Sequence, residues 1–314
     1  MKKNRLFAMA ALAVLSAPLL GQPTAVPAVT KPQTFATPQK AAEAFVAAAQ
    51  KEDKAALAAV LGVDPKLLTT GDLAIDDAEM KSFAAKAQEK MTIEPDPFGG
   101  DRVNVLIGQS AWPLPAPIVK VGKDQWAFDA RAGLEEIRAR QIGGNELDAI
   151  AILRGYADAQ RTYAATEHDG SNLLQYAQKA VSSPGKQDGL SWKGADGAPG
   201  GPVASDIAAA LWDGKSGKPT AYNGYYFRML TAQGAAVPGG ARSWIVNGSL
   251  LGGCGLIAWP EKYGTSGIQT FVVDADGNVY QKDLGAQTAA AAAAIRSYNP
   301  DKSWTLTGDA SDSE

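Results

Sequence analysis

The chain of 314 residues contains a single cysteine, Cys254, and a single histidine, His168. One thiol has no partner for an internal disulfide, and one imidazole falls short of the several nitrogen and sulfur ligands of a zinc site. This scarcity argues against zinc centres rich in histidine or cysteine. We therefore expect neither a metal site nor another cofactor.

Basic clusters and long apolar segments are also scarce. Charged residues make up 20% of the chain, the formal net charge is −3, and no cluster of Lys and Arg follows the first five residues. An acidic protein gains nothing from counterion release on a phosphate backbone, so nucleic acid is a poor partner. No segment after residue 21 approaches the length of a membrane-spanning helix.

The N-terminus has the layout of a secretory signal peptide. Lys2, Lys3 and Arg5 precede an apolar run at residues 6–15, and small or turn-forming residues follow. This order of a basic, an apolar and a small-residue region is typical of export signals. We predict a signal peptide at residues 1–21 and a periplasmic or secreted protein, with an uncleaved N-terminal anchor as the alternative. Loss of the three basic residues would change the net charge from −3 to −6.

A flexible linker is expected at residues 22–34, followed by an α+β domain at residues 35–130. Thr37 and Pro38 form an N-cap and first-turn pair that predicts a helix start, and Gly62 predicts the end of a second helix at residues 54–61. An acidic helix at about residues 76–90 precedes the predicted strands, and the proline-rich stretch at 112–115 favours an edge or a connection. These strands lie at residues 102–107, 118–121 and 125–128. The order of helices followed by a small antiparallel sheet is similar to NTF2-like proteins.

A second domain is expected at residues 131–307, with a disordered tail at 308–314. Asp129 predicts a helix to Arg140, and Gly143-Gly144 predicts its end. A new helix of about 20 residues is expected from Asn145, with an apolar stripe at helical spacing. The residues of this stripe are Leu147, Ile150, Leu153, Tyr156, Ala157, Gln160 and Tyr163.

Hairpin turns and short helices complete the second domain. Asn247-Gly248 and Asp276-Gly277 each separate two strand-like segments, which predicts two hairpins of an antiparallel β-meander. Short helices are expected near Leu173 and Ala208, and an alanine-rich helix at residues 286–298. A long helix followed by a β-meander is weakly similar in order to pilin-like subunits.

Cys254 and His168 form one possible catalytic pair. A thiolate nucleophile needs a base that lowers its pKa, and separation in sequence does not prevent the two residues from meeting. Cys254 lies in the small, apolar segment 252–257, however, which favours a buried spectator. His168-Asp169-Gly170 is explained by capping at the end of a helix. The pair remains an alternative that would make the protein an envelope hydrolase or transferase.

Two further motifs match ligand-binding patterns only in part. Asp274, Asp276 and Asn278 alternate as in a calcium loop, but residue 279 is Val where an EF-hand has Gly, so a hairpin turn is favoured. Gly253 and Gly255 match a dinucleotide fingerprint, but Trp259-Pro260 follows where a helix should begin. We expect neither site.

Aromatic residues are the remaining binding candidates. Stacking platforms for sugars and peptides use such side chains, and strand alternation places neighbours on opposite faces. One face is expected in the core and the other as an exposed apolar strip near residues 222–228. The candidate binding residues are Tyr222, Tyr225, Tyr226, Arg228, Trp244 and Trp259.

An ordered set of short motifs extends from about residue 35 to residue 304. The motifs are Phe35-Ala-Thr-Pro38, Trp112-Pro-Leu-Pro115, Trp126-x-Phe128-Asp129, Asn145-Glu146-Leu147, Tyr156-x-x-Ala159-Gln160-x-x-Tyr163, Pro184-Gly185-Lys186-x-Asp188-Gly189-Leu190, Gly224-Tyr-Tyr-Phe-Arg228 and Tyr280-Gln-Lys-Asp-Leu-Gly285. In these residues the chain resembles the bacterial family known as domain of unknown function 2950. The resemblance implies an exported bacterial protein and brings with it no activity, cofactor or catalytic residue.

The residues favour the hypothesis that the protein is a non-catalytic binding or assembly module of the bacterial envelope. Its partner would be an envelope protein, a small molecule or a polymer. The Cys254/His168 enzyme is one alternative. A pilin-like structural subunit is the other, and it requires the helix from Asn145 to pack lengthwise on the C-terminal sheet.

Overall fold

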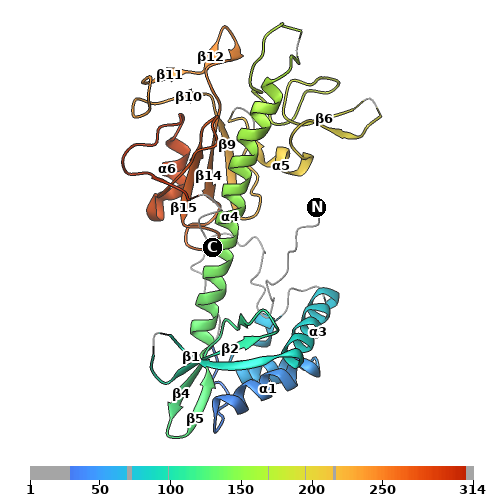
Figure 1. Ribbon diagram of the computed structural model, residues 1–314, viewed down its shortest axis with the longest axis vertical. Helices are drawn as coiled ribbons and strands as arrows, with labels where there is room; N and C mark the ends of the chain where they lie inside the picture. The colour runs from blue at the N-terminus through green and yellow to red at the C-terminus, as the bar shows by residue number, and fades with distance from the viewer. Residues whose placement is uncertain are drawn as a thin grey trace. The chain divides into compact units, whose positions relative to one another are not determined.

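The computed structural model describes residues 29–68, 73–97, 99–168, 170–194, 196–214 and 217–308. The predicted signal peptide, most of the predicted linker and nearly all of the predicted tail lie outside these residues. The chain forms two compact units, Met1–Ala139 and Arg140–Glu314, which we call the N-terminal and C-terminal units. Helices and antiparallel sheets occur in both, which confirms the α+β class (Figure 1). No helix in the described ranges is long and apolar enough to cross a membrane.

Helices open the N-terminal unit where the capping residues predict them. Helix α1 (Pro38–Gln50) starts at Thr37, whose hydroxyl accepts a hydrogen bond from the Lys40 amide at 3.2 Å. Helix α2 (Lys54–Leu61) ends at Gly62, which has the left-handed conformation that glycine adopts without strain (φ 74°). The 3₁₀ helix η1 (Pro65–Leu68) and helix α3 (Leu73–Glu89) follow.

The helices pack on an antiparallel sheet whose strands run in the order β1-β2-β4-β5, with β3 paired to β2. Its strands are β1 (Met91–Pro95), β2 (Arg102–Ile107), β3 (Trp112–Pro113), β4 (Ile118–Gly122) and β5 (Gln125–Phe128). Phe45 of α1 is central to this core, because its ring lies 5.4 Å from the rings of both Phe83 and Phe128.

One continuous helix, α4 (Ala130–Ala164), replaces the two helices predicted on either side of Gly143-Gly144. The predicted break is wrong because glycine only weakens a helix, by about 1 kcal/mol per residue, and the flanking segments are strong enough to continue. The predicted stripe is also wrong at Leu147, whose side chain is 69% exposed. Leu147 precedes the buried Leu153 by six residues, which places it about 120° away around the helix.

The C-terminal unit contains a sheet with the strand order β17-β16-β15-β14-β9-β8. Its strands are β8 (Leu211–Trp212), β9 (Tyr225–Leu230), β14 (Gly255–Pro260), β15 (Gln269–Val273), β16 (Val279–Asp283) and β17 (Thr305–Leu306). All neighbours are antiparallel except β8 and β9, which are parallel. Asp276-Gly277 lies in the connection from β15 to β16, so this predicted hairpin is confirmed.

Smaller strand pairs surround this sheet. They are β6 (Trp192–Lys193) with β7 (Pro199–Gly200), β10 (Ala232–Gln233) with β11 (Arg242–Ser243), and β12 (Ile245–Val246) with β13 (Ser249–Leu250). The second predicted hairpin joins β12 to β13, where Asn247 and Gly248 both have positive φ, 51° and 87°. The helix expected near Leu173 is wrong, because residues 170–175 contain bends and no helical turn, and Tyr176 bridges to Leu250 of β13.

Helices cover both faces of the large sheet. Buried residues of α4 such as Leu153 and Tyr156 share a core with the sheet, and Arg228 on the opposite face of β9 contacts helix α6 (Thr288–Ala294). The remaining helices are α5 (Ser205–Ala210) and the 3₁₀ helix η2 (Gly285–Gln287). Helix α6 is shorter than the predicted segment 286–298, because the chain becomes extended at Ile295.

Candidate functional site

The predicted binding strip on β9 lies inside the C-terminal unit rather than on its surface. Tyr225 is 0% exposed and Arg228 is 3% exposed, and only Tyr222 and Tyr226 are half-buried. The expectation of an exposed apolar strip is wrong because α4 covers one face of β9 and α6 lies against the other. Trp244 and Trp259 are buried as well.

Tyr225 has a structural role at the start of β9. Its hydroxyl donates to the Gln269 carbonyl at 3.0 Å, and burial raises the pKa of this hydroxyl, so it stays protonated. Glu146 of α4 accepts the backbone N–H groups of Ile268 and Gln269 at 2.8 and 2.9 Å. A β-carbon at Gly267 would lie 2.1 Å from the Tyr225 hydroxyl oxygen, so only glycine fits there. These contacts fix the first residues of β9 and β15 to α4.

Trp244 explains the glycines around Cys254. A β-carbon at Gly252, Gly253 or Gly255 would come within 3.0 to 3.3 Å of Trp244 atoms, so the indole lies directly on this backbone. The indole N–H donates to Gln233 Oε1 at 3.0 Å. The glycines that match part of a dinucleotide fingerprint therefore make room for a side chain, and they lie at the start of strand β14 rather than before a helix.

Cys254 has the environment of an inert thiol. It is completely buried, and burial, followed by the nearby charge of Asp274, raises the pKa of its thiol to about 12. A nucleophilic cysteine needs the opposite shift, since the thiolate is the reactive form. At neutral pH this thiol stays protonated.

His168 is engaged elsewhere. Its ring stacks on Tyr163 with centroids 4.0 Å apart, and its Nε2 lies 3.0 Å from the Tyr163 carbonyl and 2.9 Å from the Thr166 hydroxyl. The ring thus caps the C-terminal end of α4, as the sequence predicts. Within the described residues, no hydrogen bond connects His168 to Cys254. The arrangement gives the Cys254/His168 enzyme no support.

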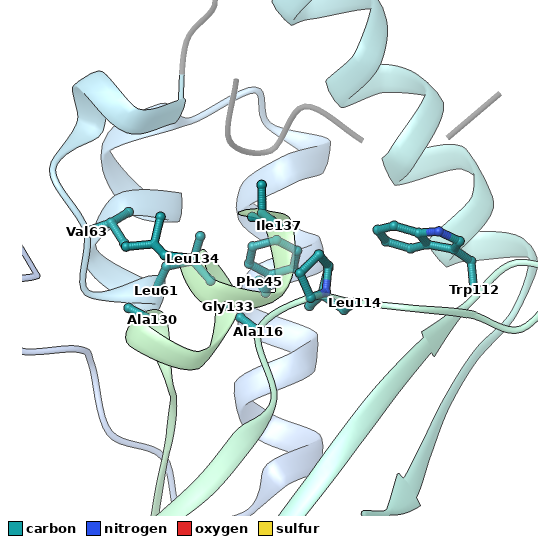
Figure 2. Close-up of a pocket in the computed structure, with 11 residues that line it drawn as sticks. Phe45, Leu61, Val63, Trp112, Leu114, Ala116, Ala130, Gly133, Leu134 and Ile137 are labelled. Carbon is teal, nitrogen blue, oxygen red and sulfur yellow. The ribbon is translucent and has the colours of Figure 1, made fainter. Parts of the chain in front are cut away.

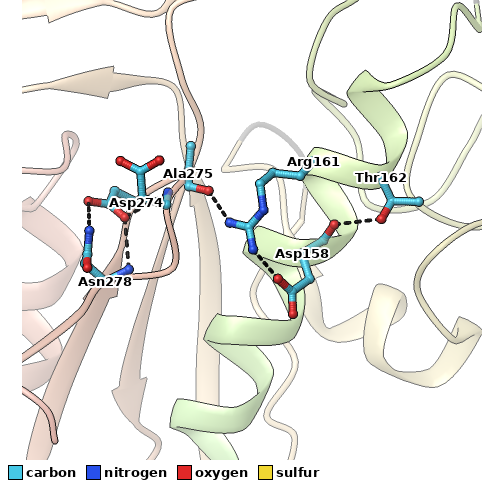
Figure 3. Close-up of polar contacts among 7 residues, drawn as sticks. Asp158, Arg161, Thr162, Asp274, Ala275 and Asn278 are labelled. Atoms are coloured by element: carbon cyan, nitrogen blue, oxygen red, sulfur yellow. Dashed lines mark hydrogen bonds and ion pairs between the residues drawn. The ribbon is translucent and has the colours of Figure 1, made fainter. Parts of the chain in front are cut away.

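The turn from Asp274 to Asn278 is filled by its own hydrogen bonds (Figure 3). Asp274 Oδ1 accepts the backbone N–H groups of Asp276 and Asn278, both at 3.0 Å. Its Oδ2 also accepts the Tyr298 hydroxyl at 3.1 Å. Arg161 of α4 donates to the Ala275 carbonyl at 2.5 Å and pairs with Asp158. Across the described parts of the chain, no three His, Cys, Asp or Glu side chains gather as metal ligands would.

An apolar pocket of the N-terminal unit lies between α1, α2, the 112–116 segment and the start of α4 (Figure 2). Its volume is about 20 Å³, and a water molecule needs about 10–15 Å³ measured in this way. A β-carbon at Gly133 would meet the Ala116 β-carbon at 2.8 Å, which shows how closely the two sides approach. This pocket is too narrow for an ordinary small-molecule ligand. Its lining residues are Phe45, Leu61, Val63, Trp112, Leu114, Pro115, Ala116, Ala130, Gly133, Leu134 and Ile137.

A larger cleft lies in the C-terminal unit between α6, the segment after it and the sheet. Its volume of about 360 Å³ falls within the range of about 300–1,000 Å³ of small-molecule sites. The cleft is on the face of the sheet that carries Arg228, since strand pairing and alternation put Val272 and Ile257 beside it. The lining residues are Val272, Lys282, Leu284, Ala291, Ala294, Ile295, Arg296, Ser297, Asn299, Asp301 and Trp304.

Charged and polar groups converge on this cleft from different segments. Lys282 of β16 donates to the Ser303 hydroxyl at 2.6 Å, and Asp301 accepts the Ser303 backbone N–H at 2.8 Å. The Ser303 hydroxyl also donates to Asp301. The two hydrogen bonds from Ser303, and then the charge of Lys282, lower the pKa of Asp301 and keep it ionised. Arg296 is exposed at the rim.

Sequence reasoning missed this cleft. Lys282, Arg296 and Trp304 follow no recognisable spacing, because they converge from a strand, a helix end and a loop. Among the candidate binding residues, Arg228 comes nearest, since it lies on the same face of the sheet but beneath α6. Lys282 lies in the motif at residues 280–285, but that motif carries no ligand chemistry of its own. Strand alternation could identify that face, but it could not show which residues remain uncovered.

Comparison with known proteins places the chain in one family. The family described as "Protein of unknown function (DUF2950)" matches residues 32–307, which is most of the chain. No curated protein and no solved structure matches the chain.

Proposed function

We propose, on the premise that the chain belongs to the DUF2950 family, that it is an exported, non-catalytic binding module whose ligand occupies the C-terminal cleft. The observation that carries this proposal is the cleft itself. It combines a volume suited to a small molecule, an apolar wall and a few polar groups from separate segments. Export is supported by the basic and apolar layout of residues 1–21.

The cleft has the two kinds of surface that a binding site needs. Leu284, Ala291 and Ile295 provide apolar contact, and half-buried Trp304 adds an aromatic face. Lys282 and Arg296 provide donors with fixed charge. Neither the thiol of Cys254 nor the imidazole of His168 lines the cleft, which supports binding without covalent chemistry.

Nuclear magnetic resonance with the full mature chain tests the binding proposal. The indole N–H signals of the seven tryptophans would be recorded, and Trp304→Phe would identify the signal of Trp304. We expect small amphipathic compounds at millimolar concentration to shift the Trp304 signal and leave that of buried Trp244 unchanged. If no compound moves the Trp304 signal, the proposed site is wrong.

A pilin-like structural subunit remains the second candidate, because one geometric requirement for it is met. Ala149, Leu153 and Tyr156 of α4 share a core with the sheet residues Phe227 and Phe271, so the helix packs on the sheet. A subunit of this kind must assemble. Crosslinking of the exported chain in cells should then give a ladder of its own multiples, whereas a binding module should give none.

A further inference from the structure

We propose that the C-terminal cleft selects a monocarboxylate that carries a flat, apolar body, a ligand class that rests on the proposed binding function. The carboxylate would lie at Arg296 and Lys282, and the body against Trp304 and Ile295. Three features of the cleft favour this ligand class: the charge of its lining, the charge beneath the lining and the shape of its apolar wall.

The lining has an excess of positive charge in a chain that is acidic as a whole. Lys282 and Arg296 contribute +2 and Asp301 contributes −1, so the lining has a net charge of +1. Arg296 makes no hydrogen bond or ion pair with any other described residue. Its guanidinium therefore presents its full set of donors to a ligand, in the planar geometry that binds a carboxylate through two parallel hydrogen bonds.

A second guanidinium lies beneath α6. Arg228 is only 3% exposed. Its guanidinium donates to the carbonyl of Ala292 at 3.0 Å and to the carbonyl of Ile295. Its guanidinium carbon lies 5.5 Å from the ring of Trp259, and no carboxylate pairs with it in the described chain. Burial, and then the charge of Arg296, lower the pKa of Arg228. The guanidinium groups of Arg228 and Arg296 therefore repel each other, and an anion bound in the cleft would reduce this repulsion.

Asp301, the acidic residue of the lining, favours a monoanion over a dianion as the ligand. Asp301 stays ionised because Ser303 and Lys282 stabilise its carboxylate, so it would repel a dianionic phosphate more strongly than a carboxylate. The apolar wall excludes a bare inorganic ion as the best ligand, since such an ion would leave Trp304, Leu284 and Ile295 without contact. A planar ring would stack on the indole.

Three probes separate these contributions in titrations of the full mature chain, followed by the indole signal of Trp304. Benzoate carries both the charge and the flat body, benzamide has nearly the same shape without the charge, and inorganic phosphate has the charge without the body. We expect benzoate to bind at least tenfold more tightly than either of the others. Its affinity should fall as salt is raised from low concentration, whereas that of benzamide should change little.

Arg296→Gln tests the assigned contact, and Arg242→Gln is the matched control, because Arg242 is also exposed in the C-terminal unit and does not line the cleft. A charge-assisted hydrogen bond contributes about 1.5–3 kcal/mol, so the Arg296 variant should bind benzoate about tenfold or more weakly. Its affinity for benzamide and the benzoate affinity of the Arg242 variant should stay unchanged. The salt dependence of the unmodified chain tests the same charge without any substitution.

The outcomes separate the two proposals. If benzamide binds as tightly as benzoate at all salt concentrations, the ligand class is wrong, while binding at the cleft stands. If phosphate binds more tightly than benzoate, the proposal that the cleft selects a monocarboxylate with a flat body is also wrong. If none of the probes, and no other amphipathic compound, shifts the Trp304 signal, the binding function itself is wrong.

Discussion

The burial of Cys254 predicts a thiol that does not react in the folded protein. Its pKa of about 12 compares with an ordinary value of 9.0. At pH 8 the thiolate fraction would fall from roughly one in ten to roughly one in ten thousand, a factor of about a thousand. Because the sulfur is also closed off from solvent, this factor is a lower bound on the loss of reactivity.

A thiol reagent that releases a coloured product measures this reactivity directly. At pH 8 the native chain is expected to react at least about a thousandfold more slowly than the chain unfolded in urea, in which the thiol is exposed. Cys254→Ala should show no reaction in either state. Rapid labelling of the native chain, at a rate close to that of the unfolded chain, would refute this account and revive the Cys254/His168 enzyme.

The same pKa shift predicts a loss of stability at alkaline pH. Between about pH 9 and pH 12 the folded chain keeps a proton that the unfolded chain has lost, so the free energy of unfolding falls as pH rises. Three pKa units correspond to about 4 kcal/mol when the whole range is crossed. Unfolding in urea at pH 8 and pH 10 should therefore show a smaller decrease for Cys254→Ala than for the unmodified chain. Equal decreases would contradict the predicted shift.

Three substitutions test the packing, each by unfolding in urea. Gly144→Ala is expected to raise the free energy of unfolding by up to about 1 kcal/mol, because its new methyl group meets no other atom and alanine favours helix; a decrease would indicate that α4 does break there. Gly267→Ala is expected to lower it by about 1–3 kcal/mol, because the methyl group would collide with Tyr225; an unchanged midpoint would contradict this close approach. Glu146→Ala is expected to lower it by roughly 2–4 kcal/mol, because two backbone N–H groups lose their acceptor; a change below about 1 kcal/mol would show that water replaces the carboxylate.

Local signals in the sequence predicted local structure well. The Thr37 cap, the Gly62 stop and the Asn247-Gly248 turn each depend on the conformation of a few adjacent residues, and the structure confirms all three. The break predicted at Gly143-Gly144 was wrong because a helix is cooperative. The cost of two glycines, about 2 kcal/mol together, is small beside the hydrogen bonds and packing of the turns on either side.

The candidate site was harder to predict because it depends on which surfaces are covered. Alternation along β9 correctly separates Tyr225 and Phe227 from Tyr226 and Arg228, but it does not show that a helix covers the second set as well as the first. A short alanine-rich segment such as α6 buries little area of its own. From sequence alone, nothing indicated that its carbonyls would receive the guanidinium of Arg228.

The motifs that identify the family and the residues that form the cleft overlap only in part. Glu146 and Tyr225, which lie in two of the quoted motifs, join α4 to the starts of β9 and β15, so they hold the fold together. Arg296 and Trp304 lie outside the quoted motifs and line the cleft. A chain could therefore retain the family motifs and bind a different ligand. Motif residues also bear on the cleft: Arg228 completes the end of α6 and places a positive charge beneath the cleft, and Lys282 lies in its lining. If the proposal is correct, a relative with Arg at position 228 but a neutral residue at position 296 should bind benzoate no more tightly than benzamide.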